Sequence, residues 1–148
     1  YTRPLMLGTR CHMLAMYVVL ENYLGMVCDY PEAYEGQPGF ECIREIPTVW
    51  DETKVLDAKV GEYITIARRK GDDWFVGTIT NHAARQIKVP FGFLQEGKYT
   101  ADIYTDAGDT DVNPNHLNKQ TIAVTREMVQ NIGIAPGGGM VIHLRKKE

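Results

Sequence analysis

Residues 47–57 read PTVWDETKVLD, and they separate two unlike parts of the chain. The first part, residues 1–50, holds a helical pattern, an apolar run and a loop rich in proline and glycine. The second part, residues 51–148, reads as short strands separated by turns. The first part is too short and too apolar to bury its own surface, so we expect it to be the tail of a larger unit.

The first part follows the order helix, strand, loop, helix. Apolar positions over residues 9–22 predict a helix that Thr9 can cap and that needs packing on most of its sides. The apolar run at 23–28 predicts a fully buried strand of a parallel sheet. A loop over 29–39 and a short helix over 40–46 follow. This order is that of the last unit of a (β/α)8 barrel.

The second part alternates apolar and polar residues with period two. Residues 62–69 and 74–81 flank the turn KGDD and predict a β-hairpin. Further strands are expected at 85–89, 98–105, 119–125, 132–134 and 140–145. The fold class is therefore α+β: a short helical remnant of a barrel end, followed by an antiparallel all-β sandwich domain.

Composition argues against several classes of protein. The net charge of −3 and the pI near 5.8 provide no basic surface for nucleic acid. The apolar stretch over 13–27 is interrupted by polar residues and is shorter than the ~20 residues of a bilayer-spanning helix. The three cysteines, at 11, 28 and 42, lie among apolar neighbours and are expected to be buried free thiols.

Several stretches resemble one enzyme family. Residues 8–19 (GTRCHMLAMYVV) are similar to the last long barrel helix of glycoside hydrolase family 97. The stretch 47–57 is also similar, and VGEY at 60–63, ARRKGDDWFVG at 67–77 and APGGG at 135–139 follow in order. Because order and spacing agree over nearly the whole chain, the chain resembles the C-terminal portion of this family.

The resemblance implies a retaining or inverting α-glycosidase of the α-glucosidase or α-galactosidase type. It implies that residues 1–50 end the catalytic (β/α)8 barrel and that residues 51–148 form the C-terminal β-sandwich domain. The family's general acid and its calcium-binding glutamates match nothing here, so this chain is assigned no catalytic residue and no cofactor, with calcium expected in the full-length enzyme. The implied partners are the parent's barrel and, through it, an oligosaccharide. The implied location is periplasmic or otherwise extracytoplasmic.

Asp29 is the candidate for substrate binding. It follows the expected strand at the carboxyl end, where barrel enzymes place their sites, and it could hydrogen-bond a sugar hydroxyl. The alternative is a loop carboxylate that caps local backbone amides.

Trp50, Asp51 and Glu52 look like a catalytic motif, but they lie where the chain leaves the expected barrel. We expect Trp50 to bury its ring between the two domains. Asp51 and Glu52 are then expected to pair with nearby cations or amides, as interface or structural residues.

No metal site is predicted. The run from Asp106 to Asn113 is spaced like the start of a calcium loop, but Pro114 and Gln120 occupy the positions that need Gly and Glu. A polar hairpin tip is the expected structure. The aromatic residues of the second part could form a sugar-stacking platform, but strand alternation favours a place in the core or an interface.

The chain is thus expected to be the C-terminal fragment of an α-glycoside hydrolase, with its sandwich as an accessory, stabilising domain. The alternative is a stand-alone carbohydrate-binding or protein-interaction module. An exposed apolar face on the first helix would also permit a homo-oligomer.

Overall fold

The computed structural model describes residues 7–147, so residues 1–6 of the expected barrel end and residue 148 lie outside the described part. The helices are α1 (Arg10–Val19), α2 (Pro31–Tyr34) and α3 (Phe40–Glu45). The strands are β1 (Glu52–Lys59), β2 (Tyr63–Lys70), β3 (Asp73–Thr80), β4 (Arg85–Pro90), β5 (Tyr99–Asp106), β6 (Leu117–Val124), β7 (Val129–Ile134) and β8 (Gly139–Lys146).

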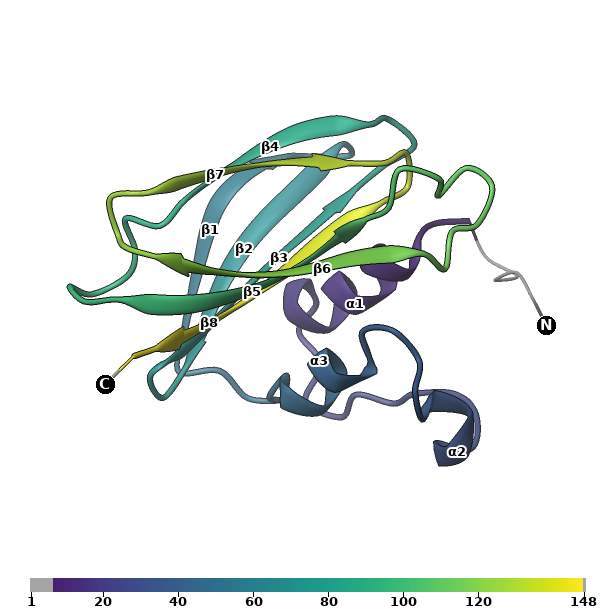
Figure 1. Ribbon diagram of the computed structural model, residues 1–148, viewed down its shortest axis with the longest axis horizontal. Coiled ribbons are helices and arrows are strands. Elements are labelled where there is room, and N and C mark those ends of the chain that lie inside the picture. The colour runs from purple at the N-terminus through teal and green to yellow at the C-terminus, as the bar shows by residue number, and fades with distance from the viewer. Residues whose placement is uncertain (1–6, 148) are drawn as a thin grey trace.

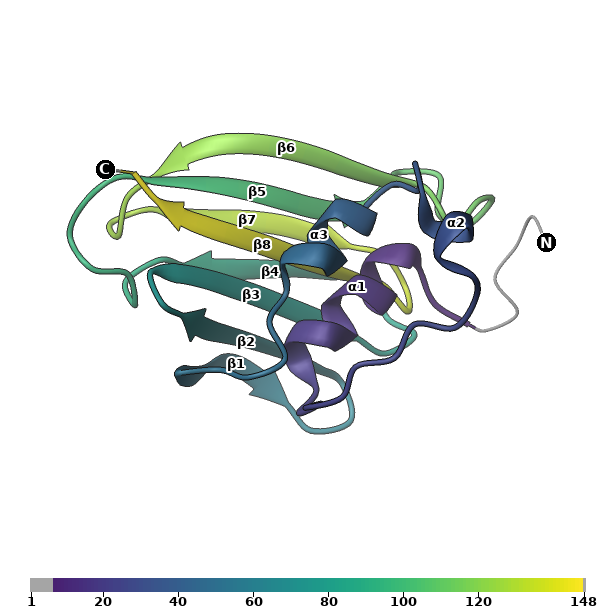
Figure 2. The same ribbon diagram turned by 90° about the horizontal axis from the view of Figure 1, so that it is seen from below.

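The strands form two antiparallel sheets. One sheet has the order β1-β2-β3-β8-β5-β6, and β4 pairs with β7 in the other. Figure 1 shows the β4–β7 pair stacked on one face of the larger sheet, and Figure 2 shows α1 and α3 on its opposite face. The antiparallel sandwich is therefore confirmed, whereas a barrel remnant is not shown.

The expected hairpin forms β2 and β3. It pairs Tyr63 with Thr80 at one end and Lys70 with Asp73 at the other, without a shift of register. Gly71 has a φ of +59° in the connecting turn, a conformation that favours glycine. The alternation of the two strands thus fixes which side chains point to the core.

The main core fills the space between the two sheets. Strand alternation directs one side chain in two to this face, which explains why the rings are buried rather than displayed. Its largest buried side chains include Trp74, Phe91, Tyr99, Ile103, Met140, Ile142 and Leu144. The prediction that the aromatic residues of the sandwich lie in the core or at an interface is confirmed for Trp74, Phe91 and Tyr99, which are core residues.

A second core lies between α1 and the outer face of the larger sheet. Leu14, Ala15 and Val18 of α1 are buried there against β3 and β8, with Phe75 on the sheet side. A Cβ at Gly77 would lie 2.8 Å from Val18 Cβ, so the helix contacts the backbone of β3 directly. The prediction of an exposed apolar face on the first helix is therefore wrong, because the sheet covers the apolar face of α1.

The region after α1 also departs from expectation. The helix ends at Val19 instead of Asn22, and residues 23–28 form no strand. Their apolar side chains are exposed, with Leu24 at 79% and Met26 at 75%. A strand needs a neighbour for its backbone hydrogen bonds, and no strand of the described residues lies beside this run. The expected loop that follows contains the one-turn helix α2.

One strand was not expected. Residues 52–59 form β1, which pairs with β2 at the edge of the larger sheet. None of its side chains is fully buried, because an edge strand contacts a neighbour on one side only. The weak apolar alternation of this stretch made it resemble a linker. The boundary at residue 50 stays a prediction.

Candidate functional site

The N-terminus of α1 is fastened to the sandwich by polar contacts. Thr9 caps the helix by accepting a bond from the His12 amide at 3.1 Å, and its hydroxyl donates to Asp106 Oδ1 at 2.5 Å. The amide of Arg10 donates to the Pro114 carbonyl at 2.8 Å. The end of β5 and the loop after it thereby hold the first turn of the helix.

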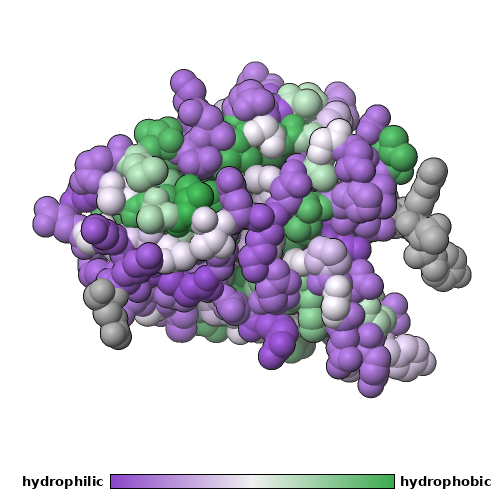
Figure 3. All heavy atoms as spheres, in the orientation of Figure 1, coloured by the Kyte–Doolittle hydropathy of each residue, from purple (hydrophilic) through white to green (hydrophobic). Residues whose placement is uncertain are grey.

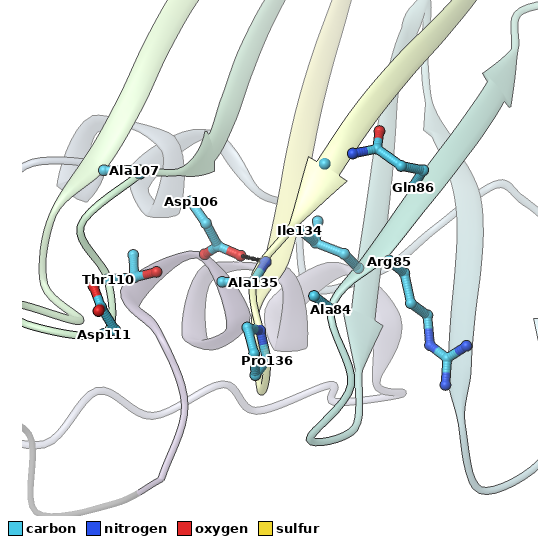
Figure 4. A pocket seen from close by; sticks show the side chains of 12 residues that line it. Ala84, Arg85, Gln86, Asp106, Ala107, Thr110, Asp111, Ile134, Ala135 and Pro136 are labelled. Carbon is cyan, nitrogen blue, oxygen red and sulfur yellow. Dashed lines mark hydrogen bonds between the residues drawn. The ribbon is translucent and has the colours of Figure 1, made fainter.

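Asp106 also lines a cleft of about 590 Å³ at one end of the sandwich. Its other oxygen accepts bonds from the amides of Ala135 (2.9 Å) and Gly139 (3.1 Å). Figure 4 shows the bond to Ala135 and the Arg85 guanidinium directed away from this carboxyl. Burial raises the pKa of Asp106 above 3.8, and the hydrogen bonds that it accepts only partly offset this effect. The carboxyl is committed to structure.

A polar bridge joins α3 to the outer face of the sheet. His143 is buried, stacks on Phe75 with ring centroids 4.1 Å apart, and donates from Nε2 to Asp73 Oδ2 at 2.8 Å. Its Nδ1 lies 2.8 Å from Glu45 Oε2, and Arg145 Nη1 donates to the same oxygen at 3.0 Å. Glu45 at the end of α3 is therefore held by two basic side chains of β8.

Asp102 is the second carboxylate that contacts Arg145. It accepts a bond from Arg145 Nη2 and another from Thr121 Oγ1 at 2.5 Å, so it links β5, β6 and β8. Burial alone would raise the pKa of Asp102, but these two hydrogen bonds stabilise the carboxylate and hold its pKa below 3.8. The charged form is the one that stabilises the fold.

The start of α3 is fixed by Glu41. Its Oε1 accepts bonds from Tyr104 (3.3 Å) and from Lys119 Nζ (3.1 Å), and the ammonium lies 5.1 Å from the Tyr104 ring centroid. Burial raises the pKa of Tyr104 to about 12, so the phenol stays a neutral donor. Both ends of α3 are therefore tied to the sheet by charged side chains.

Trp50 lies under the end of α1. Its half-buried ring meets Phe75 edge-on at 5.5 Å, and the guanidinium of Arg68 lies 5.7 Å from the ring centroid. Arg68 is buried, and its Nη2 donates to the Val19 carbonyl at 3.1 Å while Nη1 lies 2.9 Å from Glu21 Oε1. The Arg68 guanidinium thus binds one of the last carbonyls of α1, where the carbonyls lack partners within the helix.

Asp51 and Glu52 pair with cations and backbone across the edge hairpin. Asp51 accepts bonds from the Gly71 amide (2.8 Å) and Lys70 Nζ (3.1 Å), and these hold its pKa below its ordinary value. Glu52 lies 3.2 Å from Arg69 Nε and forms a further ion pair with Lys54, and both cations lower its pKa. These contacts lie within the chain, and an interface role for Trp50, Asp51 and Glu52 stays a prediction.

Asp29 is exposed and lies in the apolar segment between α1 and α2. Its Oδ1 accepts a bond from the Tyr30 amide at 2.8 Å, and its φ of +127° is unusual for a residue with a side chain. The exposed apolar side chains of this segment are Leu20, Tyr23, Leu24, Met26, Val27 and Tyr30. In the described part of the chain, Asp29 forms no hydrogen bond, ion pair or ring contact with Trp50, Asp51 or Glu52. A role of Asp29 in binding substrate stays a prediction.

Two features are absent from residues 7–147. No three His, Cys, Asp or Glu side chains in that range are grouped to hold a metal ion. Over the same residues, no helix has the length and apolarity needed to cross a membrane. The loop with calcium-like spacing instead uses Asp109 to accept a bond from His116 at 2.8 Å.

Sequence reasoning did not single out Asp102, His143 or Arg145, and it considered Asp106 only as the start of a calcium-like spacing. Each is polar and lies in or beside a strand that alternates regularly, so local pattern could mark them only as ordinary surface residues. One signal could have found them: a charged or polar residue at a strand position where the period-two alternation predicts a buried side chain. Apart from the contact between His143 and Arg145, their partners are 19 to 100 residues away in the chain, and only the folded sheet brings them together.

The class of protein that this fold and these contacts define is a β-sandwich domain with helices packed on one face. The polar and aromatic clusters described above fasten its own elements to one another. Residues 49–145 match the family model described as "Glycosyl-hydrolase 97 C-terminal, oligomerisation", and the chain belongs to this family.

Known relatives extend the match into the helical segment. The chain is 41% identical over 146 residues to a retaining alpha-galactosidase of Bacteroides thetaiotaomicron, covering 98% of this chain and 22% of the relative. It is 31% identical over 99 residues to a probable retaining alpha-galactosidase of Streptomyces bingchenggensis, covering 65% of this chain and 15% of the relative. The chain thus spans about a fifth of the length of these curated relatives or less.

A solved structure shows the same fold. A glycoside hydrolase family 97 enzyme from a Pseudoalteromonas species, in complex with acarbose, superposes with a TM-score of 0.90 at 33% identity. The match covers 95% of this chain and 23% of that enzyme. The resemblance to family 97 found in the sequence is therefore confirmed.

Proposed function

We propose that this chain is the C-terminal part of a longer α-glycoside hydrolase, in which it stabilises the catalytic body and joins copies of the enzyme. The parent would hydrolyse α-galactosidic or α-glucosidic bonds. The observation that carries the proposal is the 41% identity to a retaining alpha-galactosidase, which runs through the helices as well as the sandwich. The oligomerisation described for the matched family supports the second role.

The exposed segment over residues 20–30 supports the first role. Leu24, Met26 and Tyr30 each expose three quarters or more of their surface, although they are large and apolar. A contiguous exposed apolar patch on a soluble protein usually marks a contact surface. We assign this segment to contact with the parent's catalytic barrel, and Asp29 within it to the rim of the parent's substrate site. Trp50 and its two acidic neighbours would support this contact from the sandwich side.

An activity assay tests the proposal. The 148-residue chain and the full product of its reading frame are assayed on aryl α-galactosides and aryl α-glucosides. We expect turnover by the full product and none by the chain alone, because hydrolysis needs two carboxyl groups placed across the scissile bond. Turnover by the 148-residue chain would overturn the proposal.

Calorimetric titration separates this role from that of a stand-alone carbohydrate-binding module. The large rings that could stack on a sugar are mostly buried: Trp74, Phe75, Phe91, Tyr99 and Tyr104 each expose 4% of their surface or less. We therefore expect no saturable heat when maltooligosaccharides or galactosides are added to the chain. Saturable binding would favour the module. Calcium in the parent and its extracytoplasmic location stay expectations from the resemblance.

A further inference from the structure

The larger sheet ends in two edge strands that differ in kind. Among residues 7–147, β1 lies at one edge and β6 at the other, and Figure 2 shows α1 and α3 over the face between them. An edge strand presents unpaired backbone amides and carbonyls, which another strand can bind. Proteins that stay monomeric usually protect such edges with bulges, charges or proline.

The β1 edge carries this protection. Its register with β2 shifts between Val55 and Asp57, and such a bulge twists the edge and interrupts the regular row of backbone groups. Charged side chains also punctuate the strand at Glu52, Lys54, Asp57 and Lys59. A second strand would meet an irregular and charged backbone there.

The β6 edge is regular and nearly uncharged. All eight of its residues, from Leu117 to Val124, pair with β5 without a shift of register. Lys119 is its one charged residue, and its ammonium is held on the helical face by Glu41 at 3.1 Å. The side chains from Asn118 to Thr121 are exposed. This strand therefore lacks the protection of β1.

Apolar surface lies beside this edge. Ile122 of β6 is only partly buried, although it packs against the main core. Figure 3 shows apolar side chains gathered on the left of the view, where β6 and β7 lie in Figure 1. A partner strand on the β6 edge would extend the sheet and cover part of this apolar surface, which adds burial to the backbone hydrogen bonds.

We propose that β6 pairs antiparallel with β6 of a second copy of this chain, so that the two larger sheets become one continuous sheet across a two-fold axis. The proposal rests on the oligomerising role proposed above and names the surface that performs it. A two-fold interface brings the same surface of both copies together, and two antiparallel copies of one strand satisfy this condition. Their backbone amides and carbonyls can then form an antiparallel hydrogen-bonded ladder.

Analytical sedimentation of the 148-residue chain measures the dimer dissociation constant of variants that carry a new lysine on the β6 edge or on the β1 edge. Gln120→Lys places a like charge from each copy beside the centre of the paired strands, and Ala123→Lys adds the kind of edge lysine that discourages strand pairing. We expect each to raise the dimer dissociation constant about tenfold or more. The matched control is Val55→Lys on the exposed β1 edge, which should leave the constant within about twofold. Circular dichroism checks that each variant is folded. If one of the two β6 variants does not fold, the other still tests the proposal.

Hydrogen exchange provides a second readout. Amides of residues 117–124 should exchange more slowly as the protein concentration rises through the dissociation constant, while those of 52–59 should not change. A dimer that survives both β6 substitutions but is lost in Leu24→Ser would overturn the edge proposal and assign self-association to the apolar segment. A wild-type chain and full-length enzyme that are both monomeric would overturn the oligomerising role itself.

Discussion

The Thr9 hydroxyl donates a hydrogen bond to Asp106 Oδ1 at 2.5 Å, although 97 residues separate the two. The same hydroxyl accepts a bond from the His12 amide, so a single side chain caps α1 and fastens it to β5. Asp106 in turn binds the amides of Ala135 and Gly139 on either side of the β7–β8 turn. The first turn of the helix and one end of the sandwich therefore share a single half-buried carboxyl.

Removing either partner of this bond should destabilise the chain. We expect Thr9→Val to lower the free energy of unfolding by about 1–2 kcal/mol, because it removes the helix cap and one donor to Asp106. Asp106→Asn should lower it by a similar amount, and the double variant should lose less than the sum of the two. Urea denaturation measures all three. Asp109→Asn on the exposed loop is the control, expected within about 0.5 kcal/mol of wild type. Additive losses would show that the two residues act independently.

Gly77 is expected to admit no side chain. A Cβ there would lie 2.8 Å from Val18 Cβ and 3.1 Å from Val19 Cγ2, so Gly77→Ala should push α1 off the sheet and cost about 1–3 kcal/mol. Gly108→Ala is the matched control, since a Cβ at that position meets nothing within 4 Å. A Gly77→Ala chain as stable as wild type in urea would contradict direct packing of the helix on β3.

The Asp102 carboxylate should make stability depend on acid pH. Its pKa in the folded chain lies below 3.8, so the folded state binds this proton less readily than the unfolded state. The stability that the charged group contributes is therefore full above pH 3.8 and is lost as the pH falls through the lower, folded pKa. We expect Asp102→Asn to be clearly less stable than wild type at pH 7, with the difference shrinking below pH 3.8. Urea midpoints at pH 7 and in strong acid measure this, and a difference that is constant with pH would contradict it.

Asp106 should act in the opposite direction. Its pKa is raised by burial, so its contribution is fully present below 3.8 and is lost as the pH rises through the higher, folded pKa. The difference in the free energy of unfolding between wild type and Asp106→Asn should therefore widen toward acid pH and narrow toward neutral pH. The same pair of urea titrations separates the two carboxyls. Identical pH profiles for the two variants would refute the assignment.

The three cysteines should react at two very different rates. Cys28 is exposed, whereas Cys11 and Cys42 are buried between α1, α3 and the sheet. Burial raises the pKa of Cys42 to about 12 and that of Cys11 further, which leaves almost no reactive thiolate. We expect one fast equivalent with a thiol reagent in native buffer and three in denaturant. Cys28→Ser should abolish the fast equivalent, and a remaining fast thiol in that variant would show that the second core opens.

The fate of each cysteine also shows what sequence could predict. All three lie among apolar neighbours, so all three were expected to be buried, and this was confirmed for Cys11 and Cys42 but wrong for Cys28. The difference is not local. Cys11 and Cys42 face a sheet that begins after them in the chain, whereas the run that contains Cys28 meets no sheet among the described residues.

Strands were predictable to the extent that their alternation was strong. The β2–β3 hairpin has a turn with two aspartates and a glycine between alternating runs, and both its strands and its turn were found as expected. β1 alternates weakly and lies at an edge, so its pattern did not distinguish a strand from a linker. The polar contacts of Asp102 and Asp106 could not be found in this way, because each depends on strands that are distant in sequence.

The sequence by itself determined the periodicity of the strands, the positions of the turns, the helix that Thr9 caps and the family to which the chain belongs. These features depend on residues near one another in the chain, where side-chain period and backbone preference act directly. Only the tertiary structure decided that α1 covers the outer face of the sheet, that residues 23–28 stay exposed, and that β6 is the open edge. Burial and pairing are properties of two surfaces, and their free energy depends on which distant segment supplies the second one.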